Sequence, residues 1–381
     1  MDIRRVILAV VLMAAVLFVT PILFPTPRQT PPVGRGADST KVLTAKPGAA
    51  GVPTPQIAAT PETATPGVAV GPQAADSATM PAAVPVETTT VATKVATYRV
   101  SSRGAALVSA EMQQYRALDG SKGGNGGAPA VELARQGAPL VSMRAVIPGD
   151  TLLLDAATYT LARSTDGGRE VLAYSGTVKG TPVSITYSFA PDSYTVRVDT
   201  KVSHPSNQGY VLYQLPAGLR TTEADTAADH QALAYAFKPE KGDADIQRFD
   251  GLEPDERTVE PGPLTWAIAK NKYFIVGFLI PTGGKPFAEL ITRGVPKQEG
   301  EKFRTAATGT VVAPLDNGAH RIEVYAGPQE WRRLHALGRS FEESNPYGGW
   351  LQGFVQPFAT LVIRGMLWAK ETLALSYGWV L

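Results

Sequence analysis

Hydrophobic residues are distributed unevenly along the chain, and their pattern divides it into four stretches. Residues 6–24 are almost uniformly apolar, with Thr20 as their one hydroxyl residue. About 20 apolar residues are enough for a helix to cross the hydrocarbon of a bilayer. The pattern therefore predicts an N-terminal transmembrane anchor in residues 1–24.

Two arginines at the start of the chain predict its orientation. Arg4 and Arg5 directly precede the apolar run, and an excess of Lys and Arg marks the cytoplasmic side of a span. A cleavable signal peptide is the competing interpretation, but it has an apolar core of about 7–15 residues and a small-residue cleavage site. Here the apolar core continues to Pro25 without an Ala-x-Ala near its end. This favours an uncleaved anchor with all later residues on the outer face.

Residues 25–87 are dominated by Pro, Ala, Thr and Gly and contain no aromatic residue. Such a stretch buries too little apolar surface to offset the entropy lost on ordering. Pro-rich chains are also extended and semi-rigid. The composition predicts a disordered tether that separates a folded domain from the membrane.

Alternating apolar and polar residues then predict strands from Thr88 to about Tyr325. Between them, the segments 166–168 and 191–193 have the residues of tight turns. Residues 88–117 are predicted to form a half-buried strand pair. In the strand candidate 181–189 one face holds Val183, Ile185, Tyr187 and Phe189, and in the candidate 194–202 one face holds Val196, Val198 and Val202. Further strand candidates are 209–215, 272–280, 309–315 and 320–327. Helical periodicity is almost absent over this range. Residues 88–338 are therefore predicted to form one large β-sandwich domain.

From Pro328 onward the period becomes helical. Trp331, Leu334 and Leu337 are spaced as on one helix face, and Gly338 is a candidate stop. Residues 339–381 follow, with a second predicted helix at 357–375.

The helix at 357–375 is apolar over most of its circumference, and Gln352, Gln356, Thr360 and Arg364 form a narrow polar stripe through it. We expect an interfacial amphipathic helix with Arg364 and Trp368 near the headgroups. A helix packed beneath the sandwich, and a role for Arg364 as a buried cation that serves substrates, are alternatives. The aromatic end that contains Trp379 is typical of the start of a second membrane span.

Composition excludes several classes of function. The chain has 36 basic and 34 acidic residues, a balance that argues against a nucleic-acid-binding protein. The chain has no cysteine, which excludes disulfides, zinc–thiolate sites, iron–sulfur clusters and thiol nucleophiles, so the outer domain needs a large core. The glycine-rich segment 120–127 lacks the residue order of a phosphate-binding loop and is predicted to be a flexible loop.

The residues of catalysis are present but form no motif. The four histidines, His204, His230, His320 and His335, are not at metal-ligand spacing. Neither an HExxH nor a G-x-S-x-G motif occurs. The sequence therefore assigns no catalytic residue, no metal ligand and no cofactor-binding residue, and we expect a protein that is not an enzyme.

Several stretches, in order, resemble one family. These are the anchor 1–19, the segment 97–115, the segment 266–281 with Asn271-Lys272-Tyr273-Phe274, the segment 325–328, and the passage from Tyr347-Gly348-Gly349-Trp350 to Pro357. They are similar to the YidC family of bacterial membrane protein insertases. The resemblance implies a periplasmic β-supersandwich like that of galactose mutarotases, followed by an amphipathic helix on the outer leaflet of the inner membrane. It also implies membrane lipids, nascent membrane proteins and the Sec translocon with its accessory subunits as partners.

In that family a bundle of membrane helices encloses a hydrophilic groove with a functional arginine. The resemblance places that arginine on a helix that would start near Trp379, so we expect residues 1–381 to lack the bundle, and Arg364 does not correspond to it. A tethered carbohydrate-binding or mutarotase-like domain, which needs a His and Glu pair in a sugar cleft, is an alternative function. A periplasmic scaffold or chaperone module without chemistry is another.

Overall fold

A computed structural model describes residues 85–121, 127–345, 361–362 and 365 of the chain. The predicted anchor and tether, with Arg4 and Arg5, lie outside these residues, as do Arg364, Trp368 and Trp379. Of the predicted helix 357–375, the described positions 361–362 and 365 are helical. All the described residues belong to one compact unit, Ser77–Leu381.

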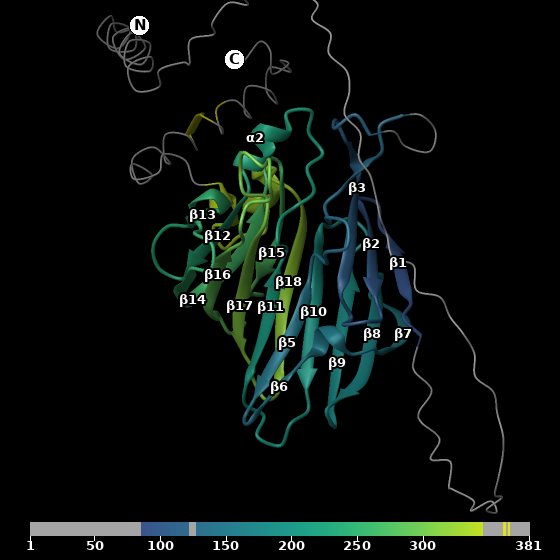
Figure 1. Cartoon of the computed structure of the whole chain (residues 1–381). Coiled ribbons are helices and arrows are strands. Elements are labelled where there is room, and N and C mark those ends of the chain that lie inside the picture. The colour runs from purple at the N-terminus through teal and green to yellow at the C-terminus, as the bar shows by residue number, and fades with distance from the viewer. Residues whose placement is uncertain (1–84, 122–126, 346–360, 363–364, 366–381) are drawn as a thin grey trace, which may run out of the picture. The chain divides into compact units, whose positions relative to one another are not determined.

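Two antiparallel sheets build the described part of the chain. The smaller sheet has the order β1 (Thr88–Ala92), β2 (Ala96–Ser101), β3 (Leu107–Arg116), β4 (Ala130–Glu132). In Figure 1 its strands lie beside those at the β7 and β8 end of the larger sheet. The predicted strand pair at 88–117 is therefore three strands, because Gly104 and Ala105 turn the chain a second time with positive φ angles of 73° and 44°.

The larger sheet continues through most of the described chain. Its order is β6 (Asp150–Leu152), β5 (Ser142–Ile147), β11 (Tyr210–Leu215), β17 (Ala307–Pro314), β16 (Phe287–Gly294), β14 (Arg257–Lys270), β15 (Phe274–Leu279), β18 (Ala319–Pro328), β10 (Thr195–Val202), β9 (Thr181–Phe189), β8 (Arg169–Val178), β7 (Thr160–Asp166), and β12 (Ala234–Pro239) pairs with both β14 and β13 (Asp245–Arg248). The expected mainly β fold is confirmed.

Short helices connect or follow the strands. They are η1 (Leu154–Ala156), α2 (Thr226–Gln231), η2 (Phe249–Gly251), α3 (Trp331–Ala336) and η3 (Phe341–Ser344). The sequence pattern missed α2, whose N-cap Asp225 accepts a hydrogen bond from the Ala228 amide at 3.0 Å. That bond satisfies one of the free amides at a helix start and lets a short helix form without a long apolar period.

Local sequence explains the strands that were predicted. The four residues Val183, Ile185, Tyr187 and Phe189 are all buried on one face of β9. Gly167 and Gly168 form the turn between β7 and β8 with φ angles of 54° and 76°. Two successive positive φ angles match the twist of a tight hairpin, which is why glycine suits both positions.

The hydrophobic core extends from β1 to η3, and the two sheets share it. Tyr98 of the smaller sheet packs against Phe189 of the larger one, with ring centroids 5.3 Å apart. The Tyr187 hydroxyl donates to the carbonyl of Ala105 at 2.6 Å, again across the sheets. The buried Tyr187 thus adds apolar area while its hydroxyl finds an acceptor. This core is the cysteine-free source of stability that the composition required.

Candidate functional site

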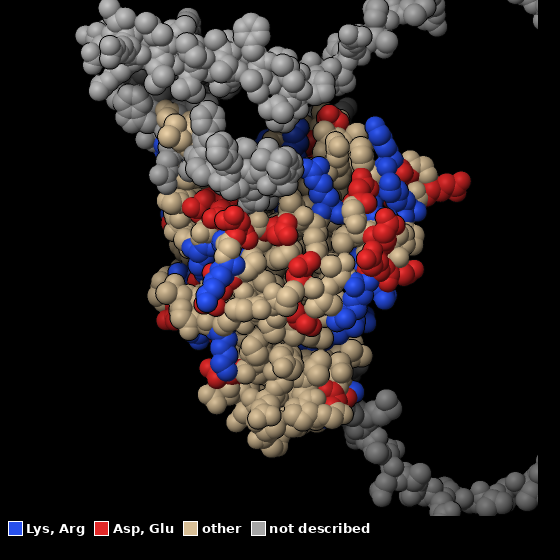
Figure 2. Space-filling model, turned by 90° about the vertical axis from the view of Figure 1, so that its left-hand side faces the viewer, with Lys and Arg blue, Asp and Glu red and all other residues tan. Residues whose placement is uncertain are grey.

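One face of the molecule carries acidic and basic side chains that are interspersed (Figure 2). Mixed charge of this kind produces no broad field of one sign that would attract a charged partner. Two features are more specific. One is the attachment of the segment after α3 to the sheet, and the other is a cleft lined by arginines.

The segment after α3 begins where the sequence predicted a helix end. Leu334 of α3 is buried, and Gly338 follows the helix with a φ of 70°. The Gly338 amide donates to the carbonyl of His335 at 3.0 Å, which closes the last turn. The predicted helix at Trp331, Leu334 and Leu337, with its stop at Gly338, is confirmed.

Arg339 and Phe341 hold this segment against the larger sheet. The indole of Trp266 donates to the carbonyl of Arg339 at 3.1 Å. Phe341 meets the rings of Trp266 and Tyr325 edge-on, with centroids 5.5 and 5.4 Å away. These contacts bury the segment instead of leaving it as a loose linker.

Two lysines extend the attachment as far as Asn345. Lys238 lies 3.1 Å from the Glu343 carboxylate. Lys270, only 4% exposed, donates to the Ser344 carbonyl at 3.2 Å and to the Asn345 side chain at 2.6 Å. Burial, together with the charge of Arg248, lowers the pKa of Lys270 to about 8. A buried cation therefore secures the point at which the described chain approaches residue 346.

A cleft of about 640 Å³ lies between the smaller sheet and loops of the larger one. It is lined by Arg99, Val108, Ser109, Glu132, Ala134, Arg135, Gln136, Gly137, Leu219, Arg220, Thr221, His230, Leu233, Glu301 and Thr305. Its volume is within the range of about 300–1,000 Å³ that is usual for ligand sites.

The two carboxylates of the cleft bind groups of the chain itself. Glu132 accepts the amides of Ala110 at 3.0 Å and Ala134 at 2.8 Å, and also the hydroxyl of Ser109. Glu301 accepts the Thr305 hydroxyl at 2.8 Å and the Gln298 amide at 3.1 Å. Glu132 thus uses both oxygens to join β4 to β3, and Glu301 uses both to stabilise its own loop.

The arginines are less fully engaged. Arg135 donates through Nη1 to the carbonyl of Thr305 at 2.9 Å. Arg99 lies 3.6 Å from Glu111 and Arg220 lies 3.9 Å from Asp119, and both arginine side chains are nearly half exposed. Exposed ion pairs at such distances contribute roughly 0–1 kcal/mol. The cleft therefore offers guanidinium donors more readily than it offers acceptors.

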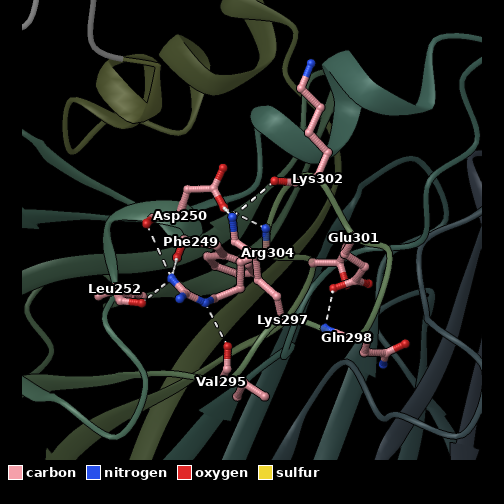
Figure 3. A network of polar contacts seen from close by, with 10 residues as sticks. Phe249, Asp250, Leu252, Val295, Lys297, Gln298, Glu301, Lys302 and Arg304 are labelled. Carbon is pink, nitrogen blue, oxygen red and sulfur yellow. Dashed lines mark hydrogen bonds and ion pairs between the residues drawn. The ribbon is translucent and has the colours of Figure 1, made fainter.

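Arg304 belongs to the loop that carries the cleft residue Glu301 (Figure 3). The residue is only 6% exposed. Its guanidinium donates to the carbonyls of Phe249 at 2.7 Å, Val295 at 2.7 Å and Leu252. Its own amide donates to the Asp250 carboxylate at 2.6 Å. Arg304 thereby joins the loop to η2 and fixes one wall of the cleft.

Helix α2 supplies another wall. Asp229 is fully buried and accepts the Lys272 amide at 3.2 Å and the Asn271 side chain at 3.5 Å. Burial raises the pKa of Asp229. These bonds join α2 to the turn between β14 and β15, and the next residue, His230, lines the cleft.

Of the histidines considered in the sequence, only His230 lines this cleft in the described part of the chain. His320 is buried in the core beside Tyr213, His204 contacts Ser206 at 2.8 Å, and His335 contacts Glu342 at 2.7 Å. Within the described residues no group of three or more metal-ligating side chains occurs. Because both cleft glutamates already accept hydrogen bonds from the chain itself, the arrangement favours binding over acid–base catalysis on a sugar.

The sequence did not reveal this cleft. Arg135 and Thr305, which meet in it, are 170 positions apart. The predicted site residues Arg4, Arg5, Arg364, Trp368 and Trp379 lie outside the described residues. Among the helices of the described chain, none combines the length and hydropathy of a membrane span.

Comparison with known proteins identifies the class of this domain. The family model of the YidC periplasmic domain matches residues 88–361. The match covers both sheets, the cleft and the attached segment, and the chain belongs to this family.

The curated relatives are longer than the chain. It is 26% identical over 301 residues to "Membrane protein insertase YidC" of Chlorobium phaeovibrioides, covering 74% of this chain and 49% of that protein. It is 27% identical over 271 residues to the protein of that name from Geobacter sp. strain M21, covering 70% and 49%. The chain spans about half the length of these two relatives.

Solved structures also match. The periplasmic domain of Thermotoga maritima YidC aligns with a TM-score of 0.35 and 11% identity, over 68% of this chain and 94% of that one. A galactose mutarotase-like protein from Lactobacillus casei aligns with a TM-score of 0.40 and 9% identity, over 64% and 100%.

Proposed function

We propose that this chain is the outer part of an insertase that assists the insertion and folding of inner-membrane proteins, alone or with the Sec translocon and its accessory subunits. The observation that carries the proposal is the family match over residues 88–361. The names of the longer relatives support it. In this proposal the substrates are nascent membrane proteins, and no cofactor or nucleic acid takes part.

The proposed topology follows from the hydropathy of the chain. Residues 1–24 anchor it with Arg4 and Arg5 in the cytoplasm, and residues 25–87 tether the domain 88–338 in the periplasm. Residues 339–381 return to the membrane, where Arg364 and Trp368 lie near the headgroups and Trp379 opens a second span. The attachment of the segment that ends at Asn345 supports this arrangement, because it holds the chain in one place just before the return.

The insertion step itself needs polar groups inside the membrane. Moving a charged or unsatisfied polar group into hydrocarbon costs several kcal/mol. A hydrophilic groove within a helix bundle lowers this cost, whereas a sandwich outside the bilayer does not. We therefore assign the chemistry of insertion to a helix bundle and assign positioning and reception of the substrate to residues 1–381.

A chimera tests this division. Cells depleted of their own insertase would express residues 1–381 alone, residues 1–381 fused to the remaining half of the Chlorobium phaeovibrioides relative, or that half alone. We expect the fusion to restore growth and membrane insertion of a reporter, and residues 1–381 alone to restore neither. Rescue by residues 1–381 alone would place the activity in this chain and contradict the proposal. The relative's half alone controls for activity that needs no outer part.

A further inference from the structure

Neither the family match nor the names of the relatives indicate what the arginine-lined cleft binds. Its lining combines guanidinium groups with apolar side chains such as Val108, Leu219 and Leu233. A ligand that suits both must carry anionic groups on a partly apolar frame. The cleft volume of about 640 Å³ accommodates a short stretch of polypeptide rather than a single ion.

The hydrogen-bonding capacity of the cleft depends on which groups are free. Glu132 accepts donors of β3 and of the loop after β4, and Glu301 accepts donors of its own loop. Outside the lining, Asp119 is engaged by the amide and hydroxyl of Ser121, which lower the pKa of its carboxyl. Glu111 lies 3.6 Å from Arg99, and its side chain is 31% exposed. The two carboxylates of the lining thus accept hydrogen bonds from the chain itself, while the arginines retain free donors.

The free donors have the geometry that carboxylates need. A guanidinium has five N–H groups in a planar fork that matches a carboxylate. In the described part of the chain, Arg135 uses Nη1 for Thr305, and Arg99 and Arg220 have only the long ion pairs already described. Three forks therefore remain able to bind incoming carboxylates, with His230 beside them.

We infer that this cleft binds acidic segments of translocated polypeptides, through their Asp and Glu side chains. The inference rests on the proposed function. Segments retained in the cytoplasm are enriched in Lys and Arg, so those that reach the outer face contain fewer basic residues to oppose their carboxylates. The free guanidinium donors of the cleft suit segments of that composition.

Peptide binding to the whole chain tests the inference. Residues 1–381 would be placed in nanodiscs of phosphatidylcholine, which has no net charge. Fluorescent ten-residue peptides of Glu and Ser, of Gln and Ser, and of Lys and Ser would be titrated at low and high salt. We expect the acidic peptide to bind at least tenfold more tightly than the other two. Its affinity should fall as salt screens the charges. Equal binding of the acidic and neutral peptides would overturn the inference.

A matched pair of variants locates the binding. Arg99→Gln combined with Arg220→Gln removes two half-exposed cleft arginines. Arg163→Gln combined with Arg321→Gln removes two exposed arginines that pair with Glu170 and Asp199 on other strands. We expect the cleft variant to lose tenfold or more in affinity and the control to stay within twofold. Equal losses in both variants would show a non-specific charge effect and overturn the inference.

Two competitors distinguish other anions. Inorganic phosphate should displace the acidic peptide only at concentrations far above those of free peptide. Displacement at equal concentration would reveal a simple anion site and contradict peptide recognition. Vesicles with anionic phosphatidylglycerol should not displace the peptide, and full displacement by them would reassign the cleft to lipid.

If the chimera rescues cells but no peptide binds, only this inference fails. If peptide binds but the chimera does not rescue, the proposed function fails instead.

Discussion

Arg339 and Glu323 form an ion pair of 2.8 Å in which the two side chains are only 18% and 17% exposed. Glu323 belongs to β18, and Arg339 follows α3, so the pair joins the end of the domain to its central sheet. Arg339 also donates to the carbonyl of Ile280 at 2.6 Å. One guanidinium thus connects β18, the end of β15 and the segment that continues to Asn345.

Removing the acid of this pair should loosen the attached segment. In Glu323→Gln the guanidinium keeps its carbonyl partners but loses its counter-charge in a mostly buried site. We expect a loss of about 1–3 kcal/mol in the free energy of unfolding. Hydrogen exchange of the amides at 331–345 should also become faster. Urea unfolding of the chain in detergent micelles, with hydrogen exchange alongside, measures both.

Asp199→Asn is the matched control. Asp199 pairs with Arg321, but the two side chains are 43% and 65% exposed. The loss of unfolding free energy in Asp199→Asn should stay below about 1 kcal/mol, as for other surface pairs. Equal effects of the two substitutions would mean that burial of the Arg339 pair does not matter.

Arg304→Met should damage the wall of the cleft. The variant keeps the length of the side chain but leaves the carbonyls of Leu252 and Val295 without this donor, and the carbonyl of Phe249 with the Leu252 amide alone. Each buried polar group that loses its partner costs about 1–3 kcal/mol. We expect a total loss of about 3 kcal/mol, measured by urea unfolding. Lys297→Met is the control, because Lys297 lies 3.5 Å from Asp250 in a pair whose side chains are 41% and 35% exposed. It should change stability by less than about 1 kcal/mol.

His320 should make the domain sensitive to acid. Burial, with a smaller contribution from the positive charge of Lys285, lowers the pKa of His320 to about 4, although a backbone hydrogen bond at Lys285 partly opposes the shift. The unfolded chain, with an ordinary pKa near 6.5, binds the proton first. Stability therefore falls as the pH drops below about 6.5 and levels off below about 4.

The size and the control of this effect follow from the same pKa values. The difference between the pKa values of His320 in the folded and unfolded chain corresponds to about 3 kcal/mol of unfolding free energy at most. His320→Leu removes the titration and keeps an apolar side chain beside Tyr213 and Phe287. Unfolding free energies of both proteins at pH 7.5 and at about pH 4 test the prediction. The wild type should lose more stability than the variant over this range, and parallel losses would assign the acid sensitivity to other groups.

Protease accessibility tests the predicted topology. If residues 25–87 are an outer tether, protease added to spheroplasts should cut there and leave a resistant fragment that begins near Thr88, where β1 starts. A tag before Arg4 should survive until the membrane is permeabilised. Protection of the whole domain in intact spheroplasts would contradict an outer location.

Spin labels test the predicted helix at 357–375. Labels at successive positions should show a helical period in their depth within the lipid, and all should remain shallow, with those beside Arg364 nearest to water. Labels that reach the centre of the bilayer would favour a membrane span. Labels that never contact lipid would favour a helix packed beneath the sandwich.

The amino-acid sequence by itself determined the class of fold, the position of several strands and turns, and the family. Where a strand has one wet and one dry face, as β9 does with Val183 and Phe189 buried, alternation is visible in the sequence. Where a turn needs positive φ, as at Gly167 and Gly168, the residue type reveals it. The same reasoning missed β12, which is buried on both faces and so does not alternate.

The tertiary structure alone decided which polar residues are buried and which meet. Nothing local distinguishes Lys270 and Arg304, which are almost completely buried, from the exposed Lys297. The cleft forms because Arg135 and Thr305 approach from positions far apart in the chain. Such contacts depend on the order in which strands pair and on the register of each pair, and a local pattern of residues contains neither. The environment of a charged side chain, and therefore its free donors and its pKa, arises only when the two sheets close around their core.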